Sequence, residues 1–264
     1  YVVSYQINSG CYSVRSNSVT IIPLSTNTWN GPVLGWSKGV VPSLNDYVVF
    51  DADYSEPVSV NSCSCAINSG KNVTITSGLF LNIINGLDVR GTGTLTFENN
   101  ASLVQINDNA VNVGNIIYNR STPLLRDLDY EYWSSPVAGQ TLGNLWTSDR
   151  YFRYTNGAWE GQTSGTTMDI GRGYIIRFRT ATSKNQDVVF EGSPNNGVKK
   201  IATQQGINTS NLIGNPYPSA LDGDAFMRNN SIIGGALYFW THFTARKLVG
   251  NNLFIMLMIM LCLI

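Results

Sequence analysis

The chain has 264 residues, 13% of them charged, and its 17 basic side chains balance 17 acidic ones, so the net charge is zero. Zero net charge argues against a nucleic-acid partner, and the lone histidine, His242, argues against a histidine triad or a multi-histidine metal site. The chain contains 29 Asn, 25 Ser, 21 Thr and 25 Gly, and this abundance of small and turn-forming residues is typical of strands joined by tight turns. Composition therefore predicts an all-β extracellular protein without evident catalytic chemistry.

Residues 1–22 alternate between apolar and polar side chains on either side of a turn at residues 8–10. This pattern predicts a hairpin that forms the last strands of a truncated domain. Cys11 lies in the second strand, and we expect that its disulfide partner lies upstream. A free buried thiol is the alternative.

Residues 23–57 contain Trp29 and Trp36 among Gly, Pro and Asn residues, followed by one apolar strand at 46–50. The two tryptophans have two interpretations. They can form a platform on which a sugar ring stacks, or they can close the open end of a β-core.

From Val58 onward, pairs of apolar residues two positions apart recur every six to eight residues, with turn residues between them. Each unit is too short to bury its own apolar face, so neighbouring units must stack. Three units per coil give rungs of roughly 22–24 residues, which predicts a single-stranded β-solenoid over residues 23–122; a β-meander is the alternative. The expected inward pairs are Val58/Val60, Cys65/Ile67, Val73/Ile75, Leu81/Ile83, Leu87/Val89, Leu95/Phe97, Val104/Ile106 and Val111/Val113.

Cys63 and Cys65 open this region and would face the same side of a strand. A metal site needs more ligands than these two thiols. They are either small buried residues or partners in a disulfide.

Residues 123–244 are denser in aromatic side chains and predict a β-sandwich or jelly-roll-like domain. Asn156-Gly157 is a strong hairpin signal. Strands are expected at 129–133, 151–154, 171–179, 187–190, 198–203, 212–213 and 236–241, with one short helix at 220–227.

Residues 245–264 break with the rest of the chain, because Leu253–Ile264 is an unbroken run of twelve apolar residues. A membrane span needs about twenty. The interpretations are a frameshift or truncation artefact, a cut-off membrane anchor, or a buried strand or helix. We assign no function to this tail.

The run from Asp129 to Pro136 (DYEYWSSP) and the run from Asn211 to Asp222 (NLIGNPYPSALD) resemble segments of large secreted surface proteins of Bacteroidetes, especially flavobacteria. The resemblance covers about residues 1–242 and is most specific at Asn-Pro-Tyr-Pro. It implies a multi-domain, adhesin-like protein exported by the type IX route and carried at the outer cell surface or released. Residues 1–22 resemble the final strands of an immunoglobulin-like repeat, and the C-terminal sorting domain usual in such proteins is lacking.

Three acidic groups are candidate calcium ligands: Asp51/Asp53/Glu56, Asp127/Asp129/Glu131 and Asp222/Asp224. Calcium takes six to eight oxygen ligands, which carboxylates and loop carbonyls can supply, and Asp222 and Asp224 are our candidates for such a site. Solvated turns are the plainer interpretation. A glycosidase pair drawn from the same carboxylates would need them to face each other across a cleft. We expect no other cofactor.

The segment Asn215-Pro-Tyr217-Pro218 is restricted by two prolines. A rigid aromatic loop loses little entropy when it binds a ligand, which makes Tyr217 a candidate binding residue. A purely structural corner is the other interpretation.

Our leading hypothesis is a non-catalytic structural and adhesive module whose partner is a polysaccharide or another cell-surface ligand. A second hypothesis, a carbohydrate-binding module attached to a polysaccharide-degrading enzyme, requires exposed aromatic residues aligned on one face; the candidates are Trp29, Trp36, Tyr154 and Trp159. A third, a β-helix hydrolase, requires acidic residues grouped on one face of the solenoid, with Asp88, Glu98 and Asp108 as candidates.

Overall fold

The structure, a computed structural model, describes residues 25–204 and 209–231, residue 233 and residues 237–239, together with the backbone of five short strands. Two of these strands, β1 (Gln6–Ile7) and β2 (Cys11–Tyr12), pair antiparallel within the expected N-terminal hairpin. The other three are β19 (Lys247–Val249), β20 (Asn252–Phe254) and β21 (Leu261–Cys262). The rest of residues 1–22, the side chain of Cys11, His242 and most of the apolar tail lie outside the described residues.

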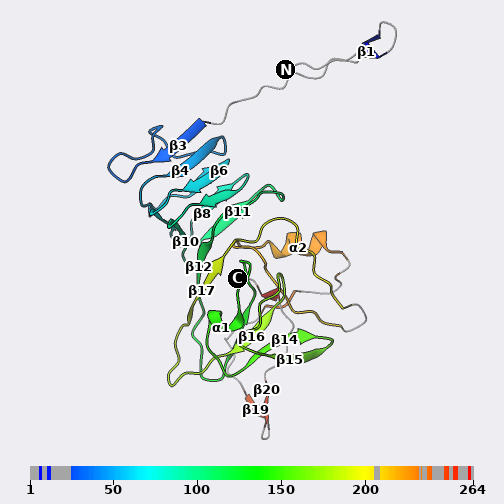
Figure 1. Ribbon diagram of the computed structural model, residues 1–264. Helices are drawn as coiled ribbons and strands as arrows, with labels where there is room; N and C mark the ends of the chain where they lie inside the picture. Colours follow the sequence, from blue (N-terminus) through cyan, green and yellow to red (C-terminus); the bar gives the residue numbers. More distant parts are fainter. Residues whose placement is uncertain are drawn as a thin grey trace.

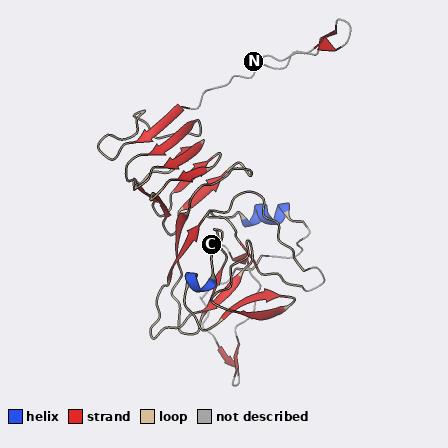
Figure 2. Ribbon diagram, in the orientation of Figure 1, coloured by secondary structure: helices blue, strands red, loops and turns tan. Residues whose placement is uncertain are grey.

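The protein is all-β, as its composition predicts (Figure 2). Only two short helices occur among the described residues, α1 (Leu142–Leu145) and α2 (Gly223–Asn229). Neither of them has the length and hydropathy needed to cross a membrane.

Three parallel sheets build a solenoid over residues 25–121 (Figure 1). Paired residues Cys65 and Leu87, Val73 and Leu95, and Leu81 and Leu103 are each 22 residues apart. The predicted rung is thus confirmed, and the parallel pairing excludes a meander, whose neighbouring strands are antiparallel. The first sheet contains β3 (Ser25–Trp29), β4 (Asp46–Phe50), β6 (Ser64–Ile67) and β9 (Leu87–Val89); the second, β7 (Asn72–Ile75), β10 (Thr94–Phe97) and β12 (Ile116–Ser121); the third, β5 (Val60–Ser62), β8 (Phe80–Ile83) and β11 (Ser102–Gln105).

Most expected inward pairs do fill the solenoid interior, but the prediction is wrong at its ends. In β11 the buried side chain is Leu103, while Val104 is 39% exposed. Two adjacent apolar residues made the alternation ambiguous there, and a shift of one residue exchanges the two faces of a strand. The remaining expected core residues that prove exposed are Val58, Ile106, Val111 and Val113.

Polar side chains at equivalent positions of successive rungs bond to one another along the solenoid. The amide of Asn107 donates to the amide oxygen of Asn85 at 3.0 Å, and Asn82 donates to Asn61 at 3.0 Å. Each contact gives an amide donor of one rung an acceptor on the neighbouring rung.

Cys63 and Cys65 are free thiols and not a disulfide. Cys65 points into the solenoid interior and is 1% exposed. Burial raises the pKa of its thiol to about 12, with a smaller contribution from Asp88.

The second part of the chain adds a four-stranded antiparallel sheet in the order β13 (Tyr130–Trp133), β16 (Tyr174–Arg177), β14 (Tyr151–Thr155) and β15 (Ala158–Gln162). One further strand, β17 (Asp187–Gly192), pairs antiparallel with β12 and so extends the second solenoid sheet past the expected boundary at residue 122. The indole of Trp133 packs against the ring of Phe190 at 5.9 Å between centroids. The four-stranded sheet therefore has the end of the solenoid as its facing layer, and the two parts share one core.

The strands expected at 129–133, 151–154, 171–179 and 187–190 are present, as is the short helix expected at 220–227. Residues 198–203 are not a strand, and the described residues 237–239 are not one either. A two-residue strand, β18 (Ile213–Gly214), lies where 212–213 was expected.

Candidate functional site

Trp29 and Trp36 close the N-terminal end of the solenoid core. Trp29 is 5% exposed, and its indole N–H donates to the carbonyl of Asp53 at 2.9 Å. The Trp36 ring lies 5.2 Å from that of Trp29 and 5.6 Å from that of Phe50. The burial of Trp29 and the contacts of both rings with Phe50 and Tyr54 favour closure of the β-core over a sugar platform, although Trp36 itself is half-buried.

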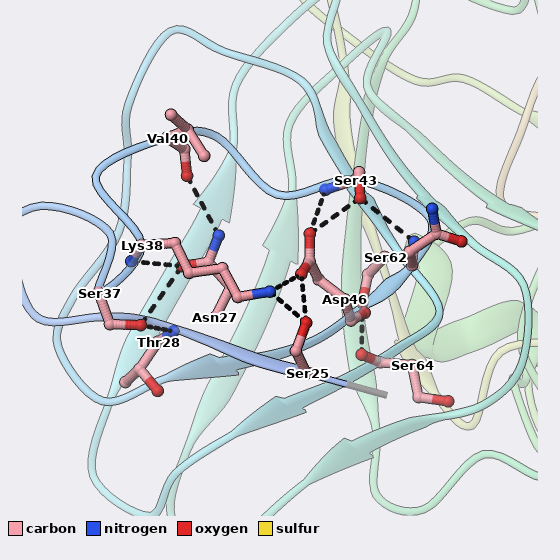
Figure 3. A network of polar contacts seen from close by, with 11 residues as sticks. Ser25, Asn27, Thr28, Ser37, Lys38, Val40, Ser43, Asp46, Ser62 and Ser64 are labelled. Carbon is pink, nitrogen blue, oxygen red and sulfur yellow. Dashed lines mark hydrogen bonds and ion pairs between the residues drawn. The ribbon is translucent and has the colours of Figure 1, made fainter. Parts of the chain in front are cut away.

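A polar network seals the same end of the solenoid (Figure 3). The carboxylate of Asp46 accepts hydrogen bonds from Lys38, from Ser25 and from both the backbone N–H and the hydroxyl of Ser43. Burial alone would raise the pKa of Asp46, but the hydrogen bonds from Lys38 and Ser43 and the charge of Lys38 together lower it to about 2. The buried amide of Asn27 bonds to Val40 and Lys38. These contacts are structural, because the Asp46 carboxylate and the Asn27 amide are both used in hydrogen bonds within the network.

Aromatic side chains of the four-stranded sheet form a second hydrophobic cluster, separate from the main core, in which they pack around the buried residues Ile175 and Leu212. Tyr154 of β14 lies directly opposite Trp159 of β15, with ring centroids 5.1 Å apart, and the Trp159 ring lies 6.4 Å from that of Tyr132 of β13. Tyr130 and Phe152 extend the group, with centroids 6.1 Å apart. We call Tyr130, Tyr132, Phe152, Tyr154 and Trp159 the aromatic face; all but the buried Tyr132 are half-buried.

The structure thus divides the four aromatic residues that the sequence offered as one platform into two separate pairs. Tyr154 and Trp159 form a pair because they flank the predicted Asn156-Gly157 turn in matching register. Trp29 and Trp36 belong to the far end of the solenoid. The sequence also contained a signal for Tyr130, Tyr132 and Phe152. Aromatic residues recur two positions apart in β13 and in β14, which places them on one face of the sheet.

Tyr217 belongs to a corner that fastens the second part of the chain to the solenoid. Its hydroxyl donates to the carbonyl of Gly197 at 2.8 Å. Asn215, fully buried, accepts the backbone N–H of Tyr217 at 3.0 Å. Asn195 donates to the carbonyls of Ser135 and Pro216. This geometry favours the structural corner over the binding loop.

Asp222 and Asp224 lie at the start of α2. The carboxylate of Asp222 caps the helix by accepting the backbone N–H of Ala225 at 2.9 Å, and Asp224 is exposed in the first turn. Across the described residues, no group of three or more His, Cys, Asp or Glu side chains is arranged to hold a metal ion.

The carboxylates expected of a solenoid hydrolase do not converge. Asp88 lies on β9 and pairs with Arg90 at 2.7 Å, whereas Glu98 lies in the turn after β10 and accepts the backbone N–H of Ser77 at 3.1 Å. Asp108 lies in the loop after β11. They lie on or next to strands of three different sheets, which argues against a carboxylate pair of the glycosidase type among them.

A cavity of about 150 Å³ lies where the solenoid meets the four-stranded sheet. Residues of the β10–β11 turn, of β12 and of β13 line it, including Asn99, Asn100, Arg120, Glu131, Tyr132 and Trp133. The cavity reaches the surface at Asn100 and borders the aromatic face through Tyr132. Pockets at such junctions are common ligand sites.

Arg120 is the unusual group in this cavity. It occupies an inward position of β12 and is 8% exposed. Its side chain donates from Nη2 to the hydroxyl of Tyr118, over whose ring it also lies at 4.4 Å. Within the described part of the chain, its Nε and Nη1 find no hydrogen-bond partner, and neither does the indole nitrogen of Trp133. Burial lowers the pKa of Arg120, against the opposing effect of Tyr118.

Our reading of the sequence missed Arg120. The alternation of Ile116, Tyr118 and Arg120 places a charge on the apolar face of a strand, which was the available signal.

The comparison with known families gives one match. A family model described as a domain of unknown function (DUF8693) matches residues 24–258. The chain belongs to this family. No curated protein and no solved structure matches the chain. The DUF8693 match spans the solenoid, the cavity and the aromatic face, so all three lie within the region that defines the family.

Proposed function

We propose that this DUF8693 chain is a non-catalytic adhesive module of a secreted cell-surface protein, in which the solenoid is a stalk and the aromatic face contacts a polysaccharide. The observation that carries the proposal is the pair Tyr154 and Trp159, half-buried and 5.1 Å apart on neighbouring strands. Aromatic rings held side by side offer apolar surfaces on which sugar rings stack with little loss of side-chain entropy.

The stalk role draws its support from the parallel stacking of rungs, which makes an elongated body of nearly constant cross-section (Figure 1). Secretion and an outer-surface location are supported by the low charge, the Asn- and Thr-rich strands and the resemblance to Bacteroidetes surface proteins. The same pair of residues also suits the second candidate, a carbohydrate-binding module within a polysaccharide-degrading enzyme.

Co-sedimentation with insoluble cellulose, chitin and xylan tests the proposal. We expect the protein to bind at least one of them, and we expect the Tyr154→Ala/Trp159→Ala double variant to bind about tenfold more weakly or worse. Phe80→Ala is the matched control, because Phe80 is an aromatic residue 40% exposed on the solenoid. Equal losses in the double variant and in Phe80→Ala, or no binding by the wild type, would contradict the aromatic face as the contact surface.

A further inference from the structure

We propose that the cavity beside Arg120 binds the carboxylate of an acidic sugar, a hexuronate, with the guanidinium of Arg120 as the donor that recognises it. The inference rests on the proposed function only in taking a sugar as the carrier of the carboxylate. The cavity and its unpaired donors stand independently of the aromatic face.

The first argument is the missing partner of a buried cation. Of the ion pairs found among the described residues, none includes Arg120, and two of its three guanidinium nitrogens lack a hydrogen-bond acceptor. A buried charge left without a partner destabilises the fold considerably. Guanidinium groups form their strongest neutralising contacts with carboxylates and phosphates, so the missing partner is an anion.

The remaining lining distinguishes a sugar acid from a phosphate. Glu131 also lines the cavity, and its Oε1 accepts the backbone N–H of Tyr132 at 3.1 Å. Its charge would repel a dianionic phosphate, whereas hydroxyl groups of a sugar can donate to a carboxylate. Asn99 and Asn100 add amide groups able to donate and to accept. A lining that combines a guanidinium, two amides and a carboxylate matches a molecule that carries one carboxylate and several hydroxyls.

Size and access agree with a single sugar unit. A volume of about 150 Å³ corresponds to about five water molecules at ~30 Å³ each, which accommodates the carboxylate end of one ring and leaves the rest at the opening beside Asn100. The unpaired nitrogens each expose less than 1 Å². Binding therefore requires a rotamer change of the Arg120 side chain toward the cavity, and such changes are common when ligands bind.

Isothermal titration with D-galacturonate and D-glucuronate tests the assignment, with D-galactose, D-glucose and methyl galacturonate as uncharged controls. We expect at least one uronate to bind about tenfold more tightly than its uncharged counterparts. Arg120→Met should abolish this preference and Arg120→Lys should weaken it, whereas Arg150→Met, which removes an exposed arginine, should leave it unchanged. Circular dichroism spectra establish that each variant is folded.

An oligogalacturonate distinguishes a free sugar acid from a polysaccharide chain as the source of the carboxylate. Binding of the oligogalacturonate, alone or together with the monomer, supports the site. Equal binding of uronate and its neutral counterpart, binding of neither monomer nor oligomer at millimolar concentration, or binding of acetate or phosphate as tight as that of the uronate would overturn it. The Tyr154→Ala/Trp159→Ala variant should still bind monomeric uronate, so failure of the proposed function and failure of this site are separable.

Discussion

The backbone N–H of Leu103 donates to the carbonyl of Pro218 at 2.7 Å. The last complete rung of the solenoid is thereby joined to the Asn-Pro-Tyr-Pro segment, more than a hundred residues further along the chain. Strand edges exposed at the end of a solenoid invite pairing with other chains. Here this segment covers the edge of β11 while β17 covers the edge of β12, so the second part of the chain caps the solenoid.

The cap depends on Asn195, a buried amide that donates to the carbonyls of Ser135 and Pro216 at 3.2 and 3.0 Å. Asn195→Ala leaves both carbonyls without this partner, so we expect the free energy of unfolding to fall by about 1–3 kcal/mol. Urea unfolding measures the change. Asn109→Ala, in an exposed loop, is the control, and a loss no greater than in that control would show that the corner does not secure the cap.

The register of β11 can be tested by truncating two adjacent residues. Leu103 is 2% exposed and Val104 is 39% exposed. Leu103→Ala should lower the free energy of unfolding by about 2–5 kcal/mol because it leaves a cavity in the solenoid interior. Val104→Ala should change it by about 1 kcal/mol or less. A larger loss in Val104→Ala than in Leu103→Ala would contradict the observed register and support the one expected from the sequence.

These two residues also show what the sequence could reveal. The length of the solenoid rung could be predicted because turns and inward apolar pairs repeat at short range along the chain. The register at Leu103 and Val104 was not, since two apolar neighbours satisfy either alternation. Trp29 pairs with Phe50 on the next rung and packs against the ring of Tyr54, and the pairing of β12 with β17 joins segments about seventy residues apart. Neither contact leaves a local pattern in the sequence.

Arg120 should destabilise the ligand-free protein. Replacing a buried, unpaired charge by an apolar side chain of similar length removes its desolvation cost, so Arg120→Met should raise the free energy of unfolding by about 1 kcal/mol or more. Arg150→Met should change it by about 0.5 kcal/mol or less. Chemical denaturation without ligand measures both. A loss of several kcal/mol in Arg120→Met would mean that Arg120 has a stabilising partner within the protein.

The lowered pKa of Asp46 makes the free energy of unfolding depend on pH in the acid range. Its pKa is about 2 in the folded protein against an ordinary value of 3.8, so the unfolded chain takes up a proton first as the pH falls. The stability that Asp46 contributes is therefore fully present above about pH 4 and is lost on acidification toward pH 2; the shift corresponds to about 2 kcal/mol.

Urea unfolding of the wild type and Asp46→Asn between pH 2 and pH 7 tests this expectation. The difference in stability between the two proteins should be largest at neutral pH and should shrink as the pH approaches 2. Asp187→Asn, at an exposed position in β17, serves as the control. A difference that stays constant over the whole range would refute the role assigned to the Asp46 carboxylate.

The adhesive role of the aromatic face is the central claim, and hydroxyl-radical footprinting with mass spectrometry tests it most directly because it reports on each tryptophan separately. In the presence of a polysaccharide that the protein binds, the account predicts that oxidation of Trp159 and Tyr154 falls severalfold while Trp29 and Trp36 keep their rates. Unchanged oxidation of Trp159 in the bound state would contradict it.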